Sequence, residues 1–222
     1  VKTDDYEGFL LDHGFQVLLT AYPEAKRYLD YEALNLKYFN PGAIIYSDNK
    51  KVAIGDPLRQ PELLFSTLFS PFATISDKLK IAKLGFQLKK KTIDEIFDDK
   101  SQTTISFLKN YGFSARIITN FFKPFFGGIF LENKLSTSSR MFQFVFKMFA
   151  EGQAAIPTKG IGQIPLQLKN KLRNTEIRLN AKVKKVDTVV HLDNGETLVA
   201  NKIVIATQPE ALIKGLDDKP NF

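Results

Sequence analysis

The chain has 222 residues, of which 44% are hydrophobic, and a formal net charge of +7 at pH 7; this length and apolar content suffice to bury a sizeable core in one or two domains. It contains no cysteine and only two histidines, His13 and His191, which excludes disulfides and thiolate ligands and argues against a zinc or serine-hydrolase site. This shortage of ligands leads us to expect no metal centre. Because neither a run of about 18 apolar residues nor a signal-peptide pattern occurs, we expect a cytoplasmic protein.

The first third of the chain predicts a small sheet. Residues 8–19 favour a short apolar strand, a turn at Asp12-His13-Gly14 and a second extended run. A short helix is expected at residues 22–30. The runs 43–47 and 51–54 are separated by turn-forming residues and predict a β-hairpin.

From Pro61 to Glu151 the pattern changes to helices. One long amphipathic segment is predicted after Ser76, with apolar residues near period 3.6 and a lysine-rich opposite face. Its apolar stripe consists of Leu79, Ala82, Phe86, Ile93 and Phe97. Further features are a helix at 103–111 closed by Gly112, a helix capped by Ser114, a break at Pro124 with Gly127-Gly128, and a helix at 139–151 with the stripe Phe142, Val145, Met148 and Phe149.

Phenylalanine is unusually frequent, with 20 residues beside no tryptophan, and nine of them lie between residues 121 and 149. Such density predicts an aromatic core, an apolar ligand pocket or a lipid-contacting surface. Core packing is the first interpretation for any one of these rings.

At Ile156 the pattern reverts to mixed α/β. A loop at 157–163 leads into a helix through about Leu172. Strands are then predicted at 177–179, 182–190 and 197–200, with a tight turn at Asp193-Asn194-Gly195 and a short buried strand at 202–207.

These elements predict a mixed α+β fold with two lobes. The α/β pattern at both ends, with helices and a small sheet between them, indicates a discontinuous domain. We therefore expect residues 1–20 and 155–222 to form one lobe and residues 21–154 to form the second.

Four segments of the last third occur in an order and spacing typical of two-domain flavoproteins. They are Gly160-Ile161-Gly162-Gln163 before a helix, the run 179–186, the hairpin Asp193-Asn194-Gly195-Glu196 and the run 203–209. Together they resemble FAD-dependent amine oxidases, protoporphyrinogen oxidases and phytoene desaturases. The resemblance implies that the first segment re-enters the cofactor domain, that the main chain of Val183 meets the adenine, and that the last run ends beneath the flavin.

The N-terminal segment 8–16 extends the resemblance. It is similar to the family's segment in which an aspartate-x-glycine turn runs along the flavin. Gly14 would let the backbone approach a bound ring closely, because no Cβ intervenes. The residues that the resemblance implies as FAD contacts are Asp12, Gly14, Phe15, Gln16, Gly160, Gly162, Val183, Ala206 and Thr207.

The family's glycine-rich dinucleotide fingerprint is absent from these 222 residues, and so is its later glycine-aspartate segment. In the fingerprint, a helix N-terminus and closely packed glycines hold the pyrophosphate. We therefore expect an internal stretch of a longer flavoprotein that does not bind FAD by itself. The fingerprint is expected in the roughly 50 residues before Val1.

The resemblance implies an FAD-dependent oxidoreductase that removes a hydride from a hydrophobic or amine substrate, a reaction that needs little acid–base machinery. No catalytic residue stands out. Lys159 and His13 could face a flavin, but an exposed lysine and a turn histidine are the simpler interpretations, and His191 lies in a predicted hairpin. If the phenylalanines line the substrate pocket, the substrate is elongated, like a polyene or a tetrapyrrole.

A second hypothesis, from a different class, is a non-catalytic module that binds apolar ligands or an anionic membrane surface. The net charge of +7 favours a peripheral membrane contact, but lysines spread over solvated helix faces give the same sum without a partner. We expect no nucleic-acid partner, because the basic residues do not alternate with stackable aromatics along strands.

Overall fold

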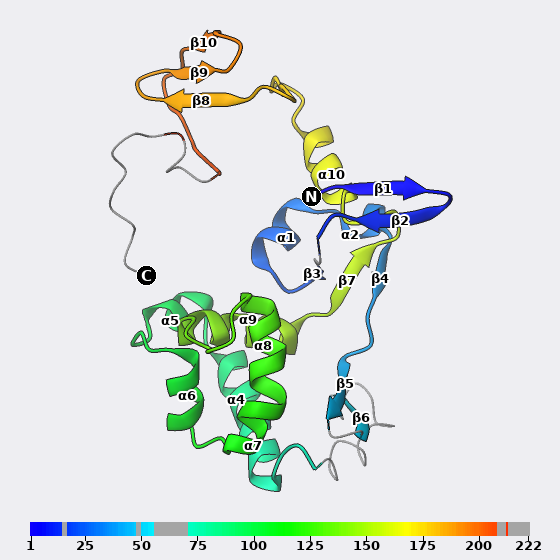
Figure 1. Cartoon of the computed structure of the whole chain (residues 1–222), viewed down its shortest axis with the longest axis vertical. Coiled ribbons are helices and arrows are strands. Elements are labelled where there is room, and N and C mark those ends of the chain that lie inside the picture. The colour runs from blue at the N-terminus through cyan, green and yellow to red at the C-terminus, as the bar shows by residue number, and fades with distance from the viewer. Residues whose placement is uncertain (15–16, 48–49, 56–70, 208–211, 213–222) are drawn as a thin grey trace. The chain divides into compact units, whose positions relative to one another are not determined.

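The computed structural model describes residues 1–14, 17–47, 50–55, 71–207 and 212 (Figure 1). The chain divides into two compact units, Val1–Lys171 and Leu172–Phe222, which are described separately. Helices and small antiparallel sheets confirm the predicted mixed α+β class. In the described part of the chain, no helix has the length and apolar character needed to cross a membrane.

An antiparallel hairpin opens the first unit. It consists of β1 (Thr3–Tyr6) and β2 (Phe9–Asp12), with Thr3 opposite Asp12 and a turn at Glu7-Gly8. The strand at β2 was predicted from its apolar residues. Its partner β1 was not, because its two aspartates are uncommon in strands.

A three-stranded sheet follows, in the order β3-β7-β4. Its strands are β3 (Leu18–Leu19), β4 (Leu36–Tyr38) and β7 (Ala154–Pro157). The helix predicted at 22–30 is α1 (Pro23–Tyr28), and a second helix, α2 (Tyr31–Leu34), begins where Asp30 caps it by accepting from Ala33 N. Leu18, Leu34, Leu36 and Ala155 form the small core of this region.

The predicted β-hairpin is confirmed. Strands β5 (Gly42–Ser47) and β6 (Lys50–Gly55) pair antiparallel, with Ser47 opposite Lys50. The turn was predicted at Asp48-Asn49-Lys50; Lys50 begins β6 instead, and Asp48 and Asn49 lie outside the described residues.

The helical part of the first unit contains the largest core. The elements are α4 (Ile75–Lys90), α5 (Ile93–Asp98), α6 (Thr104–Asn110), α7 (Ala115–Ile117), the π-helical turn η2 (Ile118–Phe122), α8 (Lys123–Phe130) and α9 (Ser139–Glu151). The predicted stop at Gly112, which has φ +87°, and the predicted cap at Ser114, whose hydroxyl accepts from Ile117 N, are both confirmed.

The single long helix predicted after Ser76 is wrong. Helix α4 ends at Lys90, and Thr92 caps α5 with a capping box of its own: the Thr92 hydroxyl accepts from Glu95 N, and the Glu95 carboxylate accepts from Thr92 N. The predicted stripe is also wrong in α4, since Leu79 and Phe86 are exposed while Leu84 and Leu88 are buried. The helix has two apolar faces, and periodicity alone does not say which one meets the core.

The aromatic segment forms the core of this helical part, so core packing is the confirmed interpretation. Phe122, Phe126 and Phe142 are at most 1% exposed, and the Phe126 and Phe142 ring centroids lie 4.7 Å apart. The break predicted at Pro124 is wrong: Pro124 lies in the first turn of α8, where its missing N–H costs nothing. Gly127 is needed inside α8, because a Cβ there would lie 2.8 Å from the carbonyl oxygen of Glu132.

The carboxylate of Asp77 links the N-terminus of α4 to the N-terminus of α7. Asp77 is 1% exposed and accepts hydrogen bonds from the backbone and hydroxyl groups of Thr74 and Ser114. Burial raises the pKa of Asp77, but these hydrogen bonds outweigh it and lower the pKa to about 2.

The first unit ends with α10 (Gln163–Lys171), which confirms the predicted helix. The second unit holds β8 (Val183–Val186), β9 (Val190–Leu192) and β10 (Thr197–Leu198) in the order β10-β9-β8. Gly195 has φ +88° and confirms the predicted turn between β9 and β10.

Three strand predictions in this unit are wrong. The run 182–190 is two strands, because Asp187 accepts a hydrogen bond from Val189 N and turns the chain. Residues 177–179 are irregular, and so is the run 202–207, where Val204 is 88% exposed. An apolar run becomes a buried strand only if other strands pair with it, and among the described residues none pairs with 202–207.

Candidate functional site

The predicted FAD contacts at Asp12, Gly160 and Gly162 lie together in the first unit. The Thr3 hydroxyl donates to Asp12 Oδ1 over 2.5 Å, and Ile161 N donates to the same oxygen over 3.0 Å. Gly162 N donates to Thr3 Oγ1 over 2.9 Å. The hairpin β1-β2 is therefore bound to the loop before α10 by its side chains.

These contacts explain both loop glycines. Gly160 has φ +85°, and a Cβ there would lie within 3 Å of the Thr3 side chain and of Asp12 Oδ1. A Cβ on Gly162 would lie 3.0 Å from Thr3 N. Thr3 is the residue that sequence reasoning missed, because its strand β1 was not predicted and no sequence signal places its hydroxyl opposite Asp12.

Gly14 differs from the loop glycines. It has φ +87°, and among the described residues no atom beyond its chain neighbours lies within 4 Å of where its Cβ would be. Its backbone is thus accessible to a bound molecule. The predicted contacts Phe15 and Gln16 lie outside the described residues.

The neighbouring His13 belongs to a surface ion-pair group. Its Nε2 lies 2.6 Å from Asp4 Oδ2, and Lys2 Nζ lies 2.7 Å from Asp4 Oδ1. Hydrogen bonds from Lys2 and then from His13 lower the pKa of Asp4. The Lys159 side chain is exposed.

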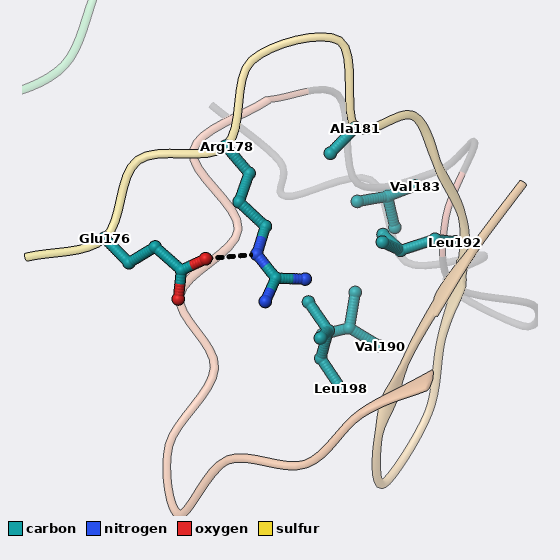
Figure 2. Close-up of a pocket in the computed structure, with 7 residues that line it drawn as sticks. All are labelled: Glu176, Arg178, Ala181, Val183, Val190, Leu192 and Leu198. Carbon is teal, nitrogen blue, oxygen red and sulfur yellow. Dashed lines mark hydrogen bonds and ion pairs between the residues drawn. The ribbon is translucent and has the colours of Figure 1, made fainter. Parts of the chain in front are cut away.

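Val183 lines a pocket of about 360 Å³ in the second unit (Figure 2). One wall is apolar, and Arg178 and Glu176 supply the charged groups. Figure 2 shows the Arg178 side chain extending from its loop toward Val190 and Leu198. The lining residues are Glu176, Arg178, Ala181, Val183, Val190, Leu192 and Leu198.

Ion pairs fix the charged rim of this pocket. Arg178 Nε lies 2.6 Å from Glu176 Oε1, and Arg178 Nη1 lies 2.6 Å from Glu196 Oε1. Hydrogen bonds to Glu176 and then Glu196 raise the pKa of Arg178. A ligand with an apolar body and a polar group suits such a lining.

The remaining candidates do not join the pocket. Ala206 and Thr207 are exposed and are not among its lining residues. His191 lies 3.2 Å from Asp187 Oδ2 and serves the turn between β8 and β9. Over the described residues, no group of three or more His, Asp or Glu side chains could hold a metal ion.

The helical part has a second pocket, of about 450 Å³, which sequence reasoning missed. Leu84, Leu88 and Phe107 form apolar walls, and Lys91 is paired with Asp99 at 2.7 Å. Two glutamines also line it: Gln87, and Gln143, which is 4% exposed. A glutamine beside the apolar stripe of α9 was the signal that could have indicated this pocket.

Comparisons with known proteins bear on both units. The family model described as flavin containing amine oxidoreductase matches residues 1–220. No curated protein matches the sequence significantly.

Proposed function

The chain belongs to the flavin containing amine oxidoreductase family, and from this premise we propose that its protein removes a hydride from a hydrophobic or amine substrate with FAD as the acceptor. The observation that carries the proposal is the extent of the match, which reaches across both compact units. Oxidoreductase chemistry with a flavin follows from the family itself.

Two places in the chain fit a bound FAD. The backbone at Gly14 is open to close approach, and the pocket at Val183 offers apolar walls beside the Arg178 guanidinium. In our proposal the main chain of Val183 contacts the adenine, and Gly14 lies along the flavin. When bound, FAD supplies the hydride acceptor; the chain positions the cofactor and excludes water.

The loop before α10 does not fit the role of a pyrophosphate grip. Such a grip needs backbone N–H groups that are free to bind phosphate oxygens. Here the N–H groups of Ile161 and Gly162 already donate to Asp12 and Thr3. Since the glycine fingerprint is also absent, we propose that residues 1–222 are part of a longer flavoprotein and do not bind FAD tightly alone.

The pocket in the helical part supports an apolar substrate. Leu84, Leu88 and Phe107 give it apolar walls, and Lys90, Lys91 and Asp99 are its charged lining residues. The phenylalanines between residues 121 and 149 are mainly core, so they give no support to an elongated polyene or tetrapyrrole. We propose a compact hydrophobic or amine substrate.

The test compares the purified chain of residues 1–222 with the full-length product of its gene. We expect flavin absorbance in the full-length protein and no binding in the micromolar range when the 222-residue chain is titrated with FAD. A full-length protein without bound flavin overturns the proposed function. Micromolar FAD binding by the 222-residue chain contradicts our proposal that this chain does not bind FAD tightly alone.

A glycine pair sharpens this test in the full-length protein. Gly8 and Gly14 both have positive φ and both have open space beside them, so alanine strains the backbone similarly at either position. We expect Gly14→Ala to weaken FAD retention roughly tenfold, because its methyl group meets the cofactor. Gly8→Ala is the matched control and should retain FAD; equal loss from both variants rejects the contact at Gly14.

A further inference from the structure

The helix α4 has an exposed apolar face opposite its buried one. Leu84 and Leu88 are at most 2% exposed and face the core. Ile75 and Leu79 are each 68% exposed, Phe86 is 62% exposed, and Ala82 is exposed as well. We name Ile75, Leu79, Ala82 and Phe86 the α4 ridge.

The four ridge residues form one narrow line. At about 100° per residue they fall within roughly 60° of the helix circumference, and they extend over roughly 16 Å of its length. The buried Leu84 lies on the opposite side. The ridge is therefore a continuous apolar strip rather than a set of scattered exposed side chains.

Lysines lie along both sides of the ridge. By the same helical geometry, the exposed Lys83 and Lys90 lie on one flank and the exposed Lys89 lies on the other, together with the half-buried Lys78. Lys90 Nζ lies 4.3 Å from the centroid of the Phe86 ring, so its charge is held at the ridge. The single acid of α4 is Asp77, which is buried and fully engaged with Thr74 and Ser114.

We propose that the α4 ridge lies on an anionic lipid surface. Ile75, Leu79 and Phe86 would enter the boundary between headgroups and acyl chains, while the flanking lysines reach the lipid phosphates and carboxylates. This inference does not depend on the bound flavin. It assigns the positive charge to a definite surface and moves the membrane contact away from the phenylalanines of residues 121–149, which are mainly core.

Charge argues against two other occupants. A second copy that packed ridge against ridge would bring the lysine flanks of the two helices together, and α4 has no exposed acid to offset them, since Asp77 is buried. A nucleic acid would contact the lysines but would leave the apolar ridge in water. A lipid surface satisfies both features, since it offers negative charge above an apolar layer.

The chain provides a clean reporter for this surface because it contains no tryptophan. In Phe86→Trp, the single tryptophan should shift its emission to the blue on adding vesicles of phosphatidylcholine with about one third phosphatidylserine. Vesicles of phosphatidylcholine alone should give a much smaller shift, and salt should reverse the binding. Leu179→Trp, at a residue 72% exposed in the second unit, is the matched control.

Co-sedimentation of the 222-residue chain with the same vesicles measures the contributions separately. Leu79→Gln with Phe86→Gln should weaken partitioning roughly 100-fold, whereas Leu179→Gln should leave it unchanged. Lys83→Gln should weaken it roughly fivefold, and Lys109→Gln on α6 much less. All these positions are exposed, so thermal unfolding should report intact folding.

Three outcomes overturn the proposal. The first is equal blue shifts at positions 86 and 179, and the second is vesicle binding that survives the double substitution. The third is a concentration-dependent dimer of the wild-type chain that Leu79→Gln with Phe86→Gln disperses, which would make the ridge a contact between copies.

Discussion

The helical part of the first unit and the strands of the second differ in how they are held. The helical part buries a continuous cluster of twelve apolar residues around Phe122, Phe126 and Phe142. Among the described residues of the second unit, only Val186 and Leu192 are buried apolar residues. Hydrophobic stabilisation scales with the apolar area removed from water, so the helices resist opening far more than the strands.

The two regions therefore differ in how firmly they can hold a binding surface. The helical part has a core of its own, and this core supports both the α4 ridge and the pocket at Gln143. The second unit is held by three short strands and by ion pairs at its rim, such as those of Arg178. Substitutions should therefore have large effects in the helices and small effects in the strands.

The largest loss is expected from Phe126→Ala. This side chain is 1% exposed and contacts the rings of Phe122, Phe142 and Phe146. Removing it should lower the free energy of unfolding by about 4 kcal/mol, from lost burial and the cavity left behind. Urea denaturation measures the loss. Phe86→Ala on the exposed ridge should cost under about 0.5 kcal/mol, and equal losses would refute the core assignment.

A loss of about 3 kcal/mol is expected from Asp77→Ala, because several buried donors lose their acceptor. The wild type should also lose about 2 kcal/mol as the pH falls from about 4 to 2. The folded pKa, about 2, lies below the unfolded value of 3.8, so this contribution is present above pH 4 and disappears on protonation. Urea denaturation across that range should show a loss smaller by about 2 kcal/mol in Asp77→Ala than in the wild type and the control Asp98→Ala, since other carboxylates with lowered pKa values, such as Asp4 and Glu132, still titrate.

In the second unit, Leu192→Ala should cost about 2 kcal/mol, at the low end for a buried leucine, since the site opens onto a pocket and can relax. Hydrogen exchange of the β8 and β9 amides measures this local loss. Leu179→Ala, at an exposed residue, should change nothing. A loss as large as that of Phe126→Ala would remove the contrast between the two regions.

The smallest effect is expected from Arg178→Met. It removes two ion pairs at an exposed rim, where water and salt weaken charge interactions. Exchange rates of the β9 amides should rise less than about fivefold at low salt and should match the wild type at high salt. A larger, salt-independent change would show that the guanidinium supports the apolar wall by packing.

Local signals predicted the fold best. Gly112, Ser114 and Gly195 each determine backbone geometry within a few residues, and each was placed correctly from the sequence. The apolar face of α4 was not, because exposed and buried stripes share the same period. The run 202–207 failed for a related reason, since strand formation depends on partners that its own residues do not specify.

At the candidate site too, the sequence did not predict contacts between residues that are distant in the chain. Family resemblance named Asp12, Gly160 and Gly162, and the structure brings them together. It does so through Thr3, whose bond to Gly162 spans 159 residues of sequence. No local pattern could predict that contact, and its consequence is that the loop N–H groups are already used.

The contact between the β1-β2 hairpin and the loop before α10 also affects when this part of the chain can finish folding. The loop that binds the β1-β2 hairpin follows it by 149 residues, counted from Asp12 to Ile161. At ribosomal speeds of 5–20 residues per second, the hairpin waits roughly 7–30 s for its partner. Until then Asp12 and Thr3 lack the backbone N–H groups of Ile161 and Gly162 that they bind in the folded chain, so the attachment of the hairpin to this loop is completed late in synthesis.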